Sequence, residues 1–121
     1  MKLLGESLIE IKKSKFIGYY YSIDNEDEAK RIMDKLHLEH KKARHIPFAY
    51  ILPNTAKKSD DKEPSNTAGL PLYNLMVMKN IDNALIAVVR YFGGTKLGAS
   101  NLLRAYLDAA KEAILNNEKR V

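Results

Sequence analysis

Residues 84–106 read ALIAVVRYFGGTKLGASNLLRAY, and this stretch decides the fold. Its first part, Ala84–Phe92, is a short apolar run rich in β-branched residues, which predicts a central β-strand. Three glycines follow, where the backbone can take positive φ angles or approach another segment closely. From Asn101 onward, apolar residues recur at intervals of three and four, which predicts an amphipathic helix. The unit is therefore a strand, a glycine loop and a helix.

The glycine loop is a candidate anion-binding site. Backbone N–H groups and the positive end of a helix dipole meet where such a loop opens a helix. The predicted nucleic-acid or anion-binding residues are Arg90, Gly93, Gly94, Lys96, Arg104, Lys12, Lys13 and Lys15. In the alternative interpretation, the glycines only turn the chain and the basic residues are solvated. A Walker loop is not predicted, because Ala99 stands where that motif requires lysine.

Composition predicts one domain over residues 1–121, since 45% hydrophobic residues suffice for a continuous core. The sequence has no cysteine, which excludes disulfides and thiolate chemistry. Twenty Lys and Arg against fifteen Asp and Glu give a net charge of +5, which favours polyanions where the charge is clustered. The sequence begins without a signal-peptide pattern and holds no apolar run of membrane length, so we expect a cytoplasmic protein without a membrane partner.

The N-terminal half predicts a hairpin, a helix and a further strand. Leu8–Lys12 alternates weakly and Phe16–Ile23 more clearly, which is typical of a β-hairpin. Asn25, followed three residues later by glutamate, predicts the start of a first helix. A third strand is predicted over His45–Leu52, and Pro47 indicates that its first half lies at an edge or a bulge.

Pro53–Pro71 is rich in Pro, Gly, Ser, Asn and Asp, which predicts one long loop. Loops of this length are usually functional or mobile. We expect this loop to come close to His45 and to the Gly93–Gly94 turn and to form one shared cleft with them, because all three lie at ends of neighbouring strands. A short helix is expected from about Leu70 onward. The residues of the predicted cleft are His45, Asp60, Asp61, Glu63 and Thr67.

No metal site, cofactor or catalytic residue is assigned from the sequence. His45 is isolated, and such a histidine is more often a hydrogen-bonded structural residue than a base. His37 and His40 have no third ligand at metal-binding spacing. An enzyme remains an alternative, in which His45 and the acidic residues of the long loop act as base and acids. The sequence holds no GxSxG or HExxH motif.

Four segments carry a family resemblance in one order along the chain: KKSKFI at 12–17, HIPFAY at 45–50, SDDKEPSNTAGLP at 59–71 and VVRYFGGTKLGASNLLRAY at 88–106. On these motifs the chain resembles the IMPACT family, which includes the bacterial YigZ proteins. The resemblance implies an α+β two-layer sandwich, with a four-stranded sheet, helices on one face and the order β-β-α-β-α-β-α. That fold is similar to the C-terminal domain of ribosomal protein S-five. The element order predicted above is the same.

The resemblance also implies a function. It suggests a non-enzymatic module that binds RNA or a ribosome-associated protein and takes part in the regulation of translation. Two alternatives stay open: a protein-interaction regulator of translation without RNA contact, and a small hydrolase-like enzyme using His45 and the acidic loop. YigZ-type proteins carry a second, ferredoxin-like domain after this one, and we expect that domain to be absent from this chain.

The chain departs from the family pattern at two positions. The family usually has glycine where this chain has Lys62 and Asn66. Asparagine tolerates a positive φ angle, whereas lysine is strained by it, so the loop either takes another path or strains Lys62. Arg90 and Arg104 also leave two alternatives, phosphate binding or pairing with a loop carboxylate. We favour pairing for Arg90 and binding for Lys96.

Overall fold

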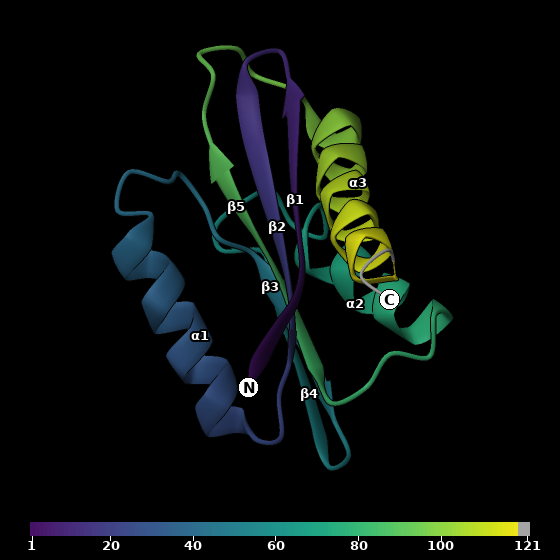
Figure 1. Cartoon of the computed structure of the whole chain (residues 1–121). Coiled ribbons are helices and arrows are strands. Elements are labelled where there is room, and N and C mark those ends of the chain that lie inside the picture. Colours follow the sequence, from purple (N-terminus) through teal and green to yellow (C-terminus); the bar gives the residue numbers. More distant parts are fainter. Residues whose placement is uncertain (119–121) are drawn as a thin grey trace.

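The computed structural model of the chain describes residues 1–118. Over these residues, one antiparallel sheet with the strand order β1-β2-β5-β3-β4 packs against three helices (Figure 1). The α+β class predicted from the sequence is confirmed. The elements are β1 (Lys2–Ile11), β2 (Ser14–Ser22), α1 (Glu26–Glu39), β3 (Phe48–Leu52), β4 (Thr55–Ser59), α2 (Gly69–Met78), β5 (Ala84–Tyr91) and α3 (Ala99–Glu118).

β5 is the central strand, as predicted. It pairs with β2 on one side and with β3 on the other. Every residue from Ala84 to Arg90 is buried. Ile86 and Val88 face α2 and α3, whereas Leu85 and Val89 face α1. Because both faces are covered, the strand is a continuous apolar run rather than an alternating one.

The prediction that all helices lie on one face of the sheet is wrong. α1 covers one face, and α2 and α3 cover the other (Figure 1). The reason is that β2, like β5, is apolar on both faces. Tyr19 and Tyr21 pack toward α1, while Phe16 and Tyr20 pack toward α3. The molecule therefore has three layers, because each apolar face must be buried against another element.

The sheet has five strands rather than the predicted four. β4 lies inside the segment predicted as a long loop, and Leu52 and Thr55 form the last pair of a hairpin closed by two residues. Four of the five residues of β4 are exposed, so the strand has no apolar alternation that the sequence could reveal. Lys57 and Lys58 stand on this outer strand, where lysine is typical because it discourages pairing with other chains.

The first helix begins where the sequence predicted. The Asn25 side chain accepts a hydrogen bond from the Glu28 N–H at 2.9 Å, and Glu28 accepts one from the Asp24 N–H at 2.7 Å. The two bonds fix the start of α1. The buried residues of α1 are the predicted ones: Ala29, Ile32, Met33 and Leu36.

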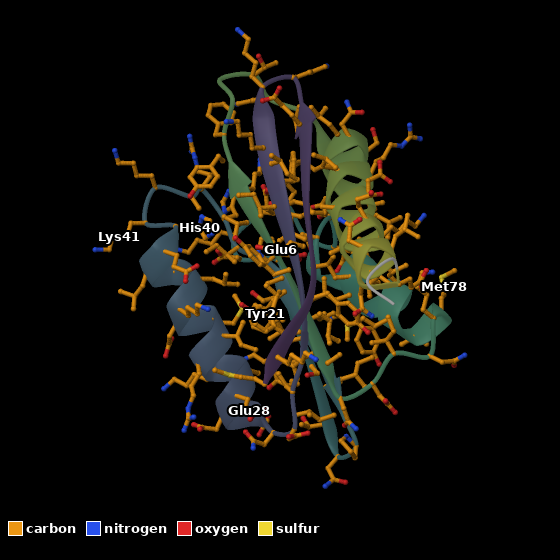
Figure 2. The ribbon with its side chains drawn as sticks, in the orientation of Figure 1. Glu6, Tyr21, Glu28, His40, Lys41 and Met78 are labelled. Atoms are coloured by element: carbon orange, nitrogen blue, oxygen red, sulfur yellow. The ribbon has the colours of Figure 1, made fainter. Side chains whose placement is uncertain are left out.

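α2 carries no charged residue along its length. Its buried residues include Leu72 and Met76, but Val77 is 51% and Met78 80% exposed, and Figure 2 shows Met78 at the outer surface. A surface helix normally has a polar outer face, so this one is unusual. None of the helices in residues 1–118 is long and apolar enough to cross a membrane.

α3 packs directly on the backbone of β1 and β2. A Cβ atom at Gly18 would lie 2.6 Å from the Ala109 carbonyl oxygen, and one at Gly5 would overlap the carbonyl group of Ala113. The Ser7 hydroxyl donates to the same Ala109 carbonyl at 2.6 Å. Small residues on both sides therefore set the distance between helix and sheet.

Replacing Gly18 by alanine tests this packing. We expect Gly18→Ala to lower the free energy of unfolding by about 1–3 kcal/mol, because the added methyl group meets helix backbone that cannot move alone. Urea denaturation measures the loss. Leu8→Ala is the matched control on the same pair of strands, since Leu8 is 63% exposed and its truncation should change stability by less than about 0.5 kcal/mol. Equal effects would contradict the packing argument.

Candidate functional site

The loop between β4 and α2 is held in place by its own carboxylates. Asp60 accepts hydrogen bonds from the N–H groups of Gly69 at 2.7 Å and Ala68 at 3.2 Å. It thereby caps α2, whose N-cap residue Ala68 has no side chain that could do so. Its second oxygen accepts from the Asn66 N–H at 2.9 Å. Asp60, predicted as a cleft residue, therefore organises the loop.

Asp61 and Thr67 have comparable tasks. The Asp61 carboxylate accepts from the Ile46 N–H at 2.6 Å, just before β3 begins. The Asp61 carbonyl oxygen accepts from His45 Nδ1 at 2.7 Å. The buried Thr67 hydroxyl donates to the Pro64 carbonyl oxygen at 2.6 Å. These bonds join the loop to the segment that contains His45.

Glu63 is the centre of a buried polar cluster. Its Oε2 accepts from Arg90 Nη1 at 2.6 Å and from the Tyr106 hydroxyl, while His45 Nε2 lies 3.5 Å from its Oε1. Glu63 is 7% and Arg90 5% exposed, and Tyr106 is fully buried. A buried carboxylate needs such partners, because an unpaired charge in the interior is very costly. The cluster ties the loop, β5 and α3 together.

Protonation in this cluster follows from its surroundings. Burial, and then the hydrogen bond to Glu63, raise the pKa of Tyr106 well above the usual range of tyrosine. Tyr106 therefore stays protonated, and its hydroxyl group donates a hydrogen bond to the Glu63 carboxylate. His45 faces the Asp61 carbonyl oxygen with one ring nitrogen and the Glu63 carboxylate with the other. Its geometry is that of a hydrogen-bonded structural residue.

Arg90 is held by backbone hydrogen bonds and by contacts of its guanidinium group. Its backbone N–H donates to the His45 carbonyl oxygen at 2.9 Å, and its own carbonyl accepts from the Arg44 N–H at 2.8 Å. Its guanidinium lies 5.7 Å from the centre of the Phe16 ring and pairs with Glu63. Arg90 thus pairs with a loop carboxylate, which is the alternative that the sequence favoured, and its side chain is buried rather than exposed.

A cleft of about 420 Å³ lies over this buried cluster. Four segments that are far apart in the sequence line it: residues 44–45, residues 62–64, Arg90 with Phe92, and residues 96–99 with Leu102. The long loop, His45 and residues 96–99 are therefore neighbours, whereas Gly93 and Gly94, which the prediction placed in the same cleft, are not in its lining. Asp60, Asp61 and Thr67, which were predicted to belong to the cleft, are not part of its lining.

Lys12 and Lys13 form the tip of the β1–β2 hairpin. Both have positive φ angles, 48° and 69°, as in a type I′ turn. Gly93 packs against them, since a Cβ atom there would overlap the Lys13 backbone, and its N–H donates to the Ser14 hydroxyl at 3.1 Å. The hairpin tip and the glycine loop therefore share one end of the sheet, at the top of Figure 1.

The other predicted basic residues take different positions. Lys96 is exposed and lines the cleft, and Gly94, with a φ of 91°, lies outside its lining. Lys15 is exposed on β2, opposite Tyr91 of β5. Arg104 is exposed on α3 and is not part of the cleft.

The sequence missed two cations of the cleft. Neither Arg44 nor Lys62 is among the residues predicted above to bind an anion. The structure places both in the cleft lining with Lys96. The missing signal was the pairing of residue 44 with Arg90, which no local pattern in the sequence reveals. In residues 1–118, no group of three or more His, Cys, Asp or Glu residues is arranged to hold a metal ion.

The loop between β4 and α2 has positive φ angles at the two positions where the family usually has glycine. Lys62 has a φ of 69° and Asn66 a φ of 64°, so both positions are in the left-handed region. Of the two alternatives that the sequence left, the strained Lys62 is the one observed. A left-handed lysine costs free energy because its Cβ atom crowds the following carbonyl group.

The family model described as the Impact N-terminal domain matches residues 12–114. The chain is therefore a member of the IMPACT family. It is 37% identical to the IMPACT family member YvyE of Bacillus subtilis over 94% of this chain and 54% of that protein. It is 34% identical to YigZ of Escherichia coli over 87% of this chain and 54% of that protein.

Solved structures agree with the family assignment. One, described as a hypothetical protein, superposes with a TM-score of 0.85 at 34% identity over 92% of this chain and 56% of its own. The two-domain translational regulator Yih1 superposes with a TM-score of 0.61 at 22% identity over 95% of this chain and 46% of its own, which is evidence for the fold alone. The chain spans about half the length of the curated relatives it matches.

Removing Arg90 tests the buried cluster. Arg90→Ala should lower the free energy of unfolding by about 3–5 kcal/mol, because it leaves Glu63 buried without its counter-ion. The double variant Arg90→Met/Glu63→Gln should recover part of this loss, since no unpaired charge remains. Urea denaturation measures both. Arg104→Ala is the exposed control and should change stability by less than about 0.5 kcal/mol; an equally small effect at Arg90 would refute the role of the cluster.

Replacing Lys62 by the family's glycine tests the strain in the loop. Lys62→Gly should raise the free energy of unfolding by about 0.5–1 kcal/mol, because relief of left-handed strain exceeds the entropy that glycine gains in the unfolded chain. Thermal unfolding measures the gain. Lys57→Gly in the extended strand β4 is the control and should destabilise the protein. Destabilisation by Lys62→Gly would show that the lysine is not strained.

Proposed function

We propose that this chain is a non-enzymatic binding module that takes part in the regulation of translation and contacts RNA through one basic end. The basic end consists of five exposed cations from four separate segments: Lys12, Lys13, Arg44, Lys62 and Lys96. Their convergence is the observation that carries the proposal. Clustered cations attract the phosphate backbone of nucleic acids, whereas the same charges spread over a surface only raise solubility.

The arrangement of these cations supports a backbone contact rather than base recognition. They come from the hairpin tip and from the lining of one cleft, so they can contact several phosphates of one strand. Phosphate contacts position a nucleic acid without reading its sequence. We therefore expect RNA binding with little sequence preference, in the cytoplasm, where translation takes place.

The role in translation draws on the family. The structural neighbour Yih1 is described as a two-domain translational regulator, and the same fold is present here. The bacterial relatives are named only as IMPACT family members. The carboxylates of the loop support a module without enzymatic activity, since Asp60, Asp61 and Glu63 are all engaged in hydrogen bonds within the protein.

A second candidate is a protein-interaction regulator without RNA contact. It is favoured by an apolar groove of about 280 Å³ between α2 and α3, whose lining includes Leu75, Met78, Leu103 and Leu107. Met78 is 80% and Leu103 39% exposed, on a helix pair whose first member is uncharged. Exposed apolar patches of this kind often mark protein interfaces.

Salt dependence of RNA binding tests the first candidate. We expect a short single-stranded RNA to bind with an affinity that falls steeply with salt. The double variant Lys12→Asn/Lys13→Gly should flatten the slope of log affinity against log salt concentration by about 0.7 for each phosphate that these lysines neutralise. Asparagine and glycine suit the positive φ angles of this turn, so the hairpin should be retained. Fluorescence anisotropy at several salt concentrations measures the slope. Lys30→Ala, on the exposed side of α1, is the control and should leave it unchanged.

The same series separates the two candidates. Absence of RNA binding at low salt would refute the first. Retention of a protein partner that resists salt and is released by Met78→Asp would then support the second, because a mixed or apolar interface depends less on ionic strength than phosphate contacts do.

A further inference from the structure

We propose that the cleft binds a phosphate monoester, and that the monoester is the phosphorylated end of an RNA strand. The RNA part rests on the proposed function. The phosphate part stands on the cleft itself, which lies between residues 44–45, the loop at 62–64 and the start of α3. Its volume of about 420 Å³ is within the range of small-ligand sites.

The charge of the cleft fits this ligand. Arg44, Lys62 and Lys96 are exposed at its rim, and Arg90 lies at its floor. Glu63 is the one carboxylate among the described residues that line it. Cations thus outnumber carboxylates by four to one. A phosphate monoester carries about 1.5 to 2 negative charges at neutral pH, compared with about one for each phosphate inside a strand.

The start of α3 supplies backbone donors. The Leu102 N–H donates to the Gly98 carbonyl oxygen at 3.0 Å, so the N–H groups of residues 99–101 precede the first helical hydrogen bond. Within residues 1–118, no side chain accepts a hydrogen bond from them, and the first turn holds no acidic residue. Gly98 and Ala99 line the cleft. The free N–H group of Ala99 and the positive end of a 20-residue helix therefore face an anion that enters it.

A separate observation comes from the floor. Arg90 is 5% exposed and uses Nη1 for Glu63, but its Nε has no hydrogen-bond partner among the described residues. A buried donor without an acceptor costs free energy, and native proteins rarely leave one. Nε is itself buried, so an anion oxygen is a suitable acceptor only where it enters the floor beside Arg90, which lines the cleft. This unpaired donor points to an anion independently of the helix.

The shape of the cleft favours the end of a strand. Its floor is closed by buried side chains, namely Glu63, Arg90, Leu97 and Leu102. An internal phosphodiester has chain on both sides and needs an open groove, whereas a terminal phosphate needs a single opening. At the rim, Phe92 is 41% exposed, and the guanidinium of Arg44 lies 4.7 Å from the centre of its ring. The first nucleotide therefore meets both an apolar and a charged surface.

RNA oligonucleotides of one sequence, with a 5′-phosphate, a 3′-phosphate or hydroxyl ends, test this inference against AMP as a free nucleotide. We expect one phosphorylated form to bind about tenfold or more tightly than the hydroxyl form, the size expected for one or more charge-assisted hydrogen bonds. Fluorescence anisotropy at one low salt concentration measures the RNA affinities, and calorimetry measures that of AMP. AMP should bind more weakly than the phosphorylated RNA, because it lacks the contacts of the strand with the basic end.

Two variants locate the effect. Lys62→Gly/Lys96→Ala, in the cleft, should abolish the preference for the phosphorylated end. Lys12→Asn/Lys13→Gly, at the hairpin tip, should weaken both forms by the same factor. Thermal unfolding checks that each variant is folded, and Lys62→Gly is not expected to lower the melting temperature.

The outcomes separate this inference from the proposed function. Equal affinities for the phosphorylated and the hydroxyl-ended RNA refute the phosphate site and leave the proposed RNA binding in place. If no RNA binds, the proposed function fails and the AMP titration decides: binding that is abolished in Lys62→Gly/Lys96→Ala supports the phosphate site, and no binding refutes it. AMP that binds as tightly as phosphorylated RNA would assign the site to free nucleotides and refute the strand end.

Discussion

The buried ion pair between Glu63 and Arg90 is the interaction on which the rest of the structure depends. It joins the loop after β4 to the last buried residue of the central strand, and the hydroxyl of Tyr106 adds α3 to the same carboxylate. Removing any partner leaves a charge or a polar group in an interior that cannot solvate it. Since the loop, β5 and α3 meet at the Glu63 carboxylate, its bonds to Arg90 and Tyr106 fix the position of the cleft above them.

This arrangement explains why an acidic loop and a basic surface can share one end of the protein. Asp60 and Asp61 are used to cap α2 and to bind the backbone before β3, and Glu63 is neutralised by Arg90. Their side chains are turned inward or along the loop. The lysines and Arg44 remain exposed, because no carboxylate of the loop is left to pair with them. The local field is therefore positive although the loop itself carries three carboxylates.

The cleft and the apolar groove are both formed in part by α3. Its first turn borders the cleft, and its middle forms one wall of the apolar groove with α2. The close packing of its alanines on Gly18 and Gly5 prevents the helix from shifting along the sheet. A ligand at the start of α3 and a protein on its flank would thus meet one rigid element, which allows both to be bound without rearrangement of the core.

The sequence by itself determined the central strand, the glycine loop, the three helices and the capping residue of α1, because each leaves a local signal of apolar period or turn chemistry. It also favoured pairing for Arg90 and left strain at Lys62 as one of two alternatives. Only the tertiary structure decided the fifth strand, the placement of helices on both faces and the membership of Arg44 and Lys62 in the cleft. These features depend on contacts between distant segments. The strand β4 is polar and is defined only by its pairing with β3. The apolar residues on both faces of β2 and β5 do not say which helix covers which face. Periodicity reports how one segment meets its surroundings, but not which segment it meets.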